Sequence, residues 1–287
     1  MGQGKMRKTK QLLGLLAIRI SILIVLVSLF AILIFIAVRG FRVLDIGFLL
    51  QPPKAGMTKG GIFPAIIGTL YLALGSICFA LPLGVFSAIY LTEYAKLRRW
   101  VRVIKIGVNA LAGVPSVVFG LFGLAVFVKF FKFGVSILAG SLTLGILILP
   151  IIIRASEEAI SAVPRGFREA SFALGASTWQ TVTRAVLPPA LPGILTGAIL
   201  GIGRAAGETA PILFTAATFY QRRLPHSIFD EVMALPYHIY ALMTEGTKPQ
   251  FQVPIAYGAA LVLLFLVLGV SLTAIVMRVR MRRAKKW

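Results

Sequence analysis

Five long runs without Asp, Glu, Lys, Arg or His constrain this chain more than any other feature of its sequence. Each is long enough to cross the roughly 30 Å hydrocarbon core of a bilayer as a helix. A sixth run, 193–219, is equally apolar but contains Arg204 and Glu208. Because 58% of all residues are hydrophobic, a soluble domain could not bury them. We therefore predict an all-α integral membrane protein with six transmembrane helices. The uncharged runs are 20–38, 60–92, 106–128, 133–153 and 249–277.

The first apolar run follows a basic N-terminal segment, as the core of a secretory signal peptide does. Its 19 residues, 20–38, are too many for such a core, and no small-residue cleavage site follows. We therefore expect a retained transmembrane helix. It belongs to a first segment, 1–62, with a basic cytoplasmic tail and an outer loop. That loop should be irregular, because it contains Pro52, Pro53 and several glycines.

The distribution of Lys and Arg indicates how the chain is oriented. The net charge of +21 would suit a nucleic acid, but the basic residues cluster beside the apolar runs, where membrane topology explains them. If the N-terminus is cytoplasmic, the inner segments carry 20 Lys and Arg and the outer segments carry nine. This excess predicts a multi-pass protein of the cell membrane, with both termini cytoplasmic and no nucleic-acid partner.

The rest of the sequence divides into a transmembrane domain, 63–278, with a cytoplasmic loop at 154–190, and a basic cytoplasmic tail, 279–287. Within the domain, proline should kink or break three helices because it cannot donate to the helix ladder. The single cysteine has no partner for an internal disulfide, and with two distant histidines it makes no metal-ligand set. We expect no metal and no cofactor. The three prolines are Pro82, Pro115 and Pro211.

The polar stretch before the fifth run predicts two short helices joined at a bend. Gly175 can end the first helix at low steric cost. Ser177 and Gln180 then form a capping box that starts a second helix. We expect Pro188 and Pro189 to end that helix. Such an elbow suits docking into a groove of a partner protein, and a plain surface hairpin is the alternative.

Two charges interrupt the fifth run near its middle. Arg204 and Glu208 are four residues apart, on one face of a helix. A charge at the bilayer centre costs about 2.5–3.5 kcal/mol on insertion scales, so both should face protein or water. Pro211 leaves the carbonyl of Gly207 without its helix donor. Arg suits phosphate, because its planar guanidinium offers two parallel donors. A structural pair that neutralises itself is the alternative.

The outer loop 220–250 is longer than a turn requires. Ile228, Val232, Leu235 and Ile239 repeat at helical spacing, which predicts a helix. It would lie at the membrane interface or cap the pore. A plain connecting helix is the alternative.

The bend resembles the EAA loop of ABC-importer permeases, which in that family couples the membrane subunit to its cytoplasmic ATPase. The pattern is EAS at 169–171, Gly175 nearby, and AVLP at 185–188. Two positions depart, because the family prefers Ala at 171 and Ile at 185. The resemblance implies that four residues couple to the ATPase: Glu169, Ala170, Ser171 and Gly175.

Three further stretches resemble PstA-type permease subunits of phosphate importers: RAAGETAPILFTAATF (204–219), GVPSVVFGLFG (113–123) and MALPYHIYAL (233–242). The resemblance extends over 63–277. It implies the type I, MetI-like importer permease fold and a translocation path that includes Arg204, Glu208 and Thr209. It also implies a second permease subunit (PstC type), ATPase subunits (PstB type) and an extracytoplasmic phosphate-binding protein (PstS type).

These features together predict the membrane-spanning permease subunit of an ATP-driven phosphate importer. The chain lacks the G-x-x-x-x-G-K-[ST] loop that cradles nucleotide phosphates, so a partner must hydrolyse ATP. A permease for another oxyanion or small solute is one alternative. A secondary transporter or channel, which needs no ATPase, is another. Transport that depends on ATP rather than on an ion gradient separates this last alternative from the others.

Overall fold

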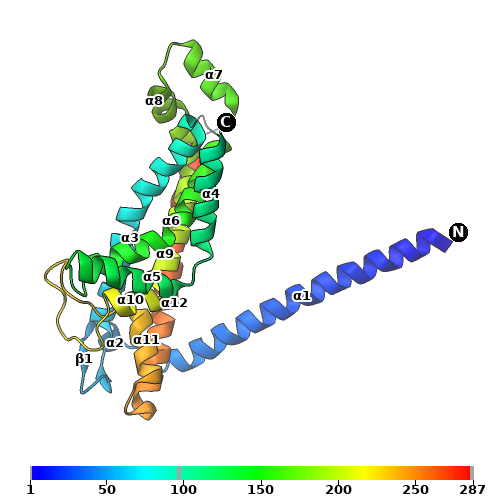
Figure 1. The fold of residues 1–287 in the computed structure, drawn as a ribbon. Helices are drawn as coiled ribbons and strands as arrows, with labels where there is room; N and C mark the ends of the chain where they lie inside the picture. The colour runs from blue at the N-terminus through cyan, green and yellow to red at the C-terminus, as the bar shows by residue number, and fades with distance from the viewer. Residues whose placement is uncertain (1, 96–97, 285–287) are drawn as a thin grey trace.

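The computed structural model describes residues 2–95 and 98–284, and the described chain is mostly helical (Figure 1). Lys96, one of the 20 Lys and Arg expected on the inner side, and residues 285–287 of the predicted tail lie outside the described residues. In chain order the elements are α1 (Gly2–Gly40), α2 (Ile46–Leu50), β1 (Pro53–Lys54), β2 (Lys59–Gly60), α3 (Phe63–Ile89), the π-helix η1 (Tyr90–Tyr94), α4 (Arg98–Ala112), α5 (Ser116–Gly123), the π-helix η2 (Leu124–Phe130), α6 (Ile137–Ser161), α7 (Arg165–Ala173), α8 (Thr178–Gln180), the π-helix η3 (Thr181–Val186), α9 (Leu187–Gly207), α10 (Ala210–Thr215), α11 (Leu235–Thr244) and α12 (Pro249–Ala284).

Within the described residues, five helical segments are long and apolar enough to span a membrane. A sixth candidate is a broken one, because Arg99–Ala112 and Ser116–Phe130 meet at an angle of 99°. Pro115 is the N-cap of α5 at this bend. By contrast, α3 continues through Pro82 without a break. The prediction of an all-helical membrane protein is confirmed, with five or six spans. The five are Gly14–Gly40, Phe63–Tyr94, Ile137–Ser161, Thr178–Gly207 and Pro249–Arg280.

The centre of the bundle is formed by α3, α6 and α9, which pack side by side. Leu144, Ile148 and Ile152 of α6 are fully buried and form the middle of this core. The helices α6 and α9 approach closely because α9 lacks side chains at the contact. A Cβ atom on Gly197 would lie only 2.5 Å from the Cβ of Ala155. Small residues therefore set the separation of these two helices, as in many membrane bundles.

The bundle has two distinct ends (Figure 1). The elbow end carries α7 and α8. The hairpin end carries α2, α11 and the strand pair, in which Pro53 pairs with Gly60. The prediction of an irregular loop at 39–61 is wrong, because Asp45 caps α2 by accepting a hydrogen bond from the Phe48 amide. Phe48 and Met57 are buried against α11 and α12, so this loop is a packed part of the fold.

The loop 220–250 contains a shorter helix than its sequence spacing predicts. Residues 221–234 are irregular, and α11 begins only at Leu235. Val232 instead forms an isolated bridge with Ala217. Asp230 accepts hydrogen bonds from the amides of His226 and Ser227, so its carboxylate stabilises a turn where the spacing suggested helix. The helix α11 packs between α3 and α12.

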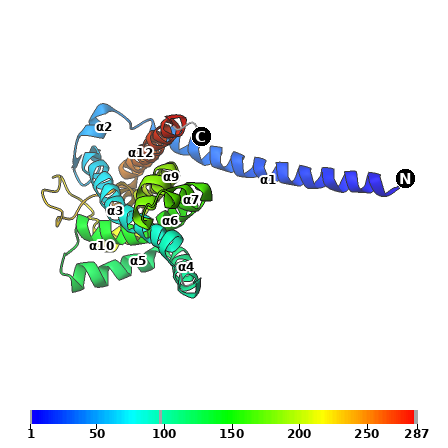
Figure 2. The ribbon, with the colours of Figure 1, turned by 90° about the horizontal axis from the view of Figure 1, so that it is seen from above.

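The helix α1 extends away from the bundle as a single long rod (Figures 1 and 2). Most of its apolar side chains are exposed along 14–40. At its C-terminal end α1 packs on α12, where the rings of Phe35 and Tyr257 meet edge to face with centroids 5.6 Å apart. The Arg39 guanidinium lies 4.5 Å from the Phe35 ring centroid.

Candidate functional site

The helix α9 ends at the charged pair. The sequence placed Arg204 and Glu208 near the middle of one apolar helix, but α9 stops at Gly207. Glu208 is the C-cap residue, with φ −76° and ψ 130°, and the chain resumes as α10 after Thr209. The missing N–H of Pro211 explains why the helical ladder does not continue across this point.

The pair spans this break with a direct hydrogen bond. Arg204 donates from Nε to Oε1 of Glu208 at 3.1 Å. The Arg204 side chain is 40% exposed and that of Glu208 is 18% exposed. Leu200 and Gly207 lie on the same face of α9 as Arg204 and are also exposed. The charged face of α9 is therefore left uncovered by the described part of the chain.

Two interrupted helices meet beside the pair. The short helix α10, which follows the break in α9, packs against α5, which follows the bend at Pro115. Pro211 is buried in this contact region. Thr209 precedes α10 as its N-cap residue, and its side chain makes no capping hydrogen bond. Non-helical backbone at membrane depth is tolerated where it is buried in protein or lines a water-filled cavity.

The elbow is built from two local capping motifs. Gly175 has φ +78°, and its amide donates to the carbonyl of Phe172 at 2.9 Å. The Ala176 amide donates to the carbonyl of Ser171, which completes a Schellman motif at the end of α7. Ser177 and Gln180 then form both hydrogen bonds of a capping box, which confirms that prediction.

The second helix of the elbow does not end where the sequence predicts. The π-helix η3 runs directly into α9, and α9 begins at Leu187 with Pro188 and Pro189 in its first turn. The prediction that these prolines terminate a helix is wrong. Proline is tolerated in a first turn, where its missing N–H would have no partner within the helix. The elbow is therefore continuous with α9.

Two of the residues assigned to ATPase coupling, Glu169 and Ala170, are exposed on α7. Gly175 is also exposed at the bend. Ser171 instead lies partly buried, and its hydroxyl is 2.9 Å from the hydroxyl of Thr181 in η3. Ser171 thus bonds the two arms of the elbow to each other.

The elbow also exposes large apolar side chains that sequence reasoning did not assign to a surface. Leu174 is 89% exposed, Trp179 54% and Phe172 49%. A cluster of such residues on a polar, capped segment is typical of a protein-interaction surface. The available signal was the presence of Phe and Trp in a segment that is otherwise polar.

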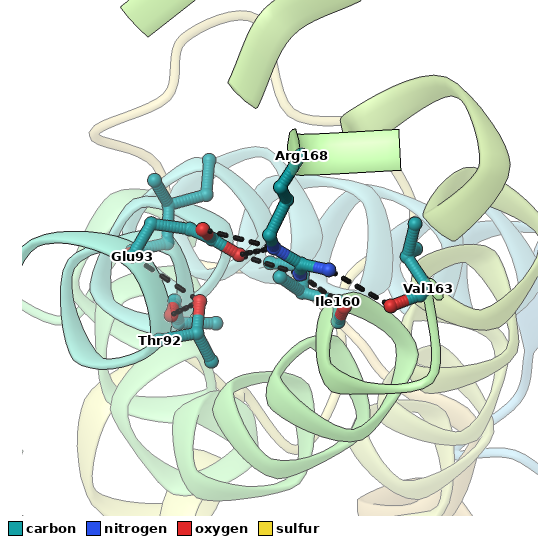
Figure 3. A network of polar contacts seen from close by, with 7 residues as sticks. Thr92, Glu93, Ile160, Val163 and Arg168 are labelled. Carbon is teal, nitrogen blue, oxygen red and sulfur yellow. Dashed lines mark hydrogen bonds and ion pairs between the residues drawn. The ribbon is translucent and has the colours of Figure 1, made fainter. Parts of the chain in front are cut away.

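A second charged contact, between Arg168 of α7 and Glu93 of η1, was also missed (Figure 3). No local pattern announces it, because the two residues are 75 positions apart. Both side chains border a cavity of about 540 Å³ at the elbow end, together with Glu169.

A buried histidine lies at the hairpin end, outside the candidate spans. His238 of α11 is 2% exposed, and neither ring nitrogen has a hydrogen-bond partner among the described residues. Burial lowers the pKa of this imidazole to about 4, so the ring is neutral near pH 7. No group of three His, Cys, Asp or Glu side chains arranged to hold a metal ion occurs in the described chain.

Residues 80–285 match the family model described as the binding-protein-dependent transport system inner membrane component. Over 258 residues the chain is 40% identical to the phosphate transport system permease protein PstA of Mycobacterium leprae (strain TN). That alignment covers 88% of this chain and 83% of the relative.

Solved structures of ABC transporters share the fold, and two of them serve as examples. One is a bacterial ABC transporter involved in the import of the acidic polysaccharide alginate, with a TM-score of 0.66, 19% identity, and coverage of 98% of this chain and 99% of that chain. The other is the MetNI methionine ABC transporter in an inward-facing conformation, with a TM-score of 0.59, 19% identity, and coverage of 77% and 97%. The MetI-like fold predicted from the sequence is confirmed.

Proposed function

The chain belongs to the family of binding-protein-dependent transport system inner membrane components, and from that premise we propose that it is the membrane-spanning permease subunit of an ATP-driven phosphate importer. The 40% identity to a phosphate permease over most of both chains supports phosphate as the solute. The more distant structural relatives, at 19% identity, support the fold alone.

The observation that carries the proposal is the Arg204 guanidinium at the break in α9. Among the described residues it donates through Nε to Glu208, and its two terminal amino groups remain available to an anion. A planar guanidinium can bind two oxygens of one phosphate. Arg204, Glu208 and Thr209 would therefore line the translocation path, with Arg204 offsetting the charge of the passing phosphate.

The chain would form only half of that path. The face of α9 that carries Leu200, Arg204 and Gly207 is exposed in this chain. The charge of Arg204 would be unfavourable if this face were in contact with lipid. A second, homologous permease of the PstC type covers this face in our proposal, and the phosphate would pass between the two subunits.

The remaining partners follow from the two ends of the bundle. The elbow end, with Glu169, Ala170 and Gly175 on its surface, would dock a PstB-type ATPase in the cytoplasm. The apolar side chains of Phe172, Leu174 and Trp179 support such a contact. The hairpin end would then face a PstS-type phosphate-binding protein outside the cell. In this proposed arrangement both termini would lie in the cytoplasm, the partner would hydrolyse ATP, and the permease would hold no cofactor.

A permease for another oxyanion or small solute would use the same elbow, so the test must measure the solute. We propose phosphate uptake by a deletion strain, with and without this gene supplied on a plasmid. High-affinity uptake should return with the gene. Restored uptake of a different oxyanion, without phosphate, would favour the alternative.

A further inference from the structure

The Arg168 side chain joins three segments of the elbow end (Figure 3). Its Nε lies 3.0 Å and 3.2 Å from the two carboxylate oxygens of Glu93, and its Nη2 lies 2.7 Å from Oε1 of Glu93. The same guanidinium donates to the carbonyl of Ile160 at 3.0 Å and to that of Val163 at 2.8 Å. One side chain on α7 is thereby bonded to η1, to the end of α6 and to the α6–α7 turn.

This contact is protected from water more than a surface ion pair is. The Arg168 side chain is 18% exposed and that of Glu93 is 11% exposed. A bidentate arginine–carboxylate contact also fixes the angle between its partners, which a single-point contact does not. The contact is therefore suited to hold α7 and η1 in one orientation.

The two sides of the contact differ in how firmly they are held. The helix α7 has no buried residue, and Ser171 bonds it to η3. Glu93 lies on η1, which continues α3 without interruption. The helix α3 packs along α6 in the central core. Arg168 thus connects a peripheral helix of the elbow directly to a helix of the membrane core.

We propose that the Arg168–Glu93 contact is a positioning link that carries displacement of the elbow into α3. This link rests on the proposed function and extends it. In addition to α9, a second helix is then displaced when the ATPase moves. The elbow runs through η3 into α9, which carries Arg204. Arg168 provides a second route, through η1, into α3. Both helices then move together, and breaking the link uncouples ATP hydrolysis from transport.

The position of Glu93 on a π-helix supports this role. The amide of Ala95 donates to the carbonyl of Tyr90, five residues earlier. The helical turn of η1, which continues α3, is therefore wider than a turn of α-helix. Single-turn π segments are frequent at functional sites, where they shift side chains out of the regular helical register. Here the widened turn carries the carboxylate that Arg168 binds.

The test measures phosphate transported per ATP hydrolysed by the reconstituted complex, with co-purification of the ATPase as the measure of assembly. Glu93→Gln and Arg168→Gln should lower this ratio roughly 2- to 30-fold, the range of coupling changes seen for single residues in other proteins. ATP hydrolysis and assembly should persist. Arg168→Lys keeps the charge and loses the fork, so its ratio should fall less. The double neutral variant should be no worse than the more affected single.

The matched control is the ion pair between Lys105 and Glu157. It lies at the same end and borders the same cavity, but it joins α4 to α6 rather than to α7. Lys105→Gln with Glu157→Gln should leave the ratio unchanged. An unchanged ratio in the Glu93 and Arg168 variants, or an equal fall in the control, would overturn the link.

Loss of assembly in every variant, including Arg168→Lys, would also overturn the proposal, because the contact would then only hold the fold together. The outcome is separable from the proposed function. If the unmodified complex transports no phosphate with ATP, the phosphate assignment fails. The link is then tested with the solute that the complex does transport.

Discussion

Arg204 and Glu208 are hydrogen-bonded across the end of a helix, with Nε of Arg204 3.1 Å from Oε1 of Glu208. Arg204 is still helical, whereas Glu208 has already adopted an extended backbone. An ordinary i,i+4 pair lies on one continuous helix. This pair instead closes over an interruption, so a change in either charge acts on the geometry of the break as well as on the local electrostatics.

The first prediction concerns the anion site. Arg204→Gln keeps most of the bulk and removes the charge, so phosphate uptake should fall by more than about tenfold, the equivalent of roughly 1.4 kcal/mol. Arg204→Lys keeps the charge without the fork and should be partly active. Glu208→Gln should be less harmful than Arg204→Gln. Uptake is measured beside the amount of protein in the membrane.

The double variant Arg204→Gln/Glu208→Gln separates this role from a structural one. If the pair only neutralises itself, each single change strands a charge and lowers the amount of folded protein, and the double variant recovers. If Arg204 serves the anion, the double variant stays inactive although the protein is present. Recovered uptake in the double would end the transport role.

The second prediction concerns the bend. Gly175 has φ +78°, and no atom lies within 4 Å of a Cβ placed on it. Gly175→Val should therefore act through backbone strain rather than through a clash, at a cost of about 1–2 kcal/mol. Transport should fall while the chain still inserts. Gly175→Asn is the matched control, because Asn tolerates this conformation better. If Gly175→Val transports as well as the unmodified protein, the elbow does not need the bend.

The third prediction concerns orientation. A cysteine that replaces Arg99, in the first turn of α4, should be shielded from an impermeant reagent added outside intact cells. A cysteine at Lys54, in β1, should react. Both positions are exposed on the chain. The native Cys78 is also exposed and must first be replaced. The reverse labelling pattern would contradict cytoplasmic termini.

The fourth prediction concerns pH. Burial lowers the pKa of His238 to about 4, below the ordinary value of 6.5, so the unfolded chain binds more protons than the folded chain between these values. The free energy of unfolding that depends on keeping this ring neutral is fully present above pH 6.5 and is lost as pH falls toward 4. The loss should be on the order of 2–3 kcal/mol. The Tm of the purified protein should drop over this range.

His238→Phe should flatten that dependence, because the buried ring no longer titrates. His226→Gln, which changes an exposed histidine, should leave it intact. A Tm that falls equally with pH in the His238→Phe protein would assign the effect to other groups.

Local signals in the sequence predicted the features that local chemistry controls. The capping box at Ser177 and Gln180 and the bend at Gly175 are specified within a few residues. Long apolar runs likewise specified most of the spans. The continuation of the elbow through Pro188 into α9 was not predictable in the same way, because proline both ends helices and begins them.

Features that depend on distant contacts were missed. The packing of α10 against α5 is one example, because neither apolar run reveals which helix it contacts. Arg168 and Glu93 are 75 positions apart in the chain, and no local pattern links them. The irregular start of the loop 220–250 depends on hydrogen bonds to Asp230, although its spacing resembles a helix.

The most direct test of the central claim is uptake of radiolabelled phosphate by vesicles that contain this chain, the second permease and the ATPase, with the phosphate-binding protein supplied on the outer side. The account predicts uptake that requires ATP inside the vesicle, persists when ion gradients are collapsed, and is lost with Arg204→Gln. Uptake that proceeds without ATP and follows an ion gradient would contradict it.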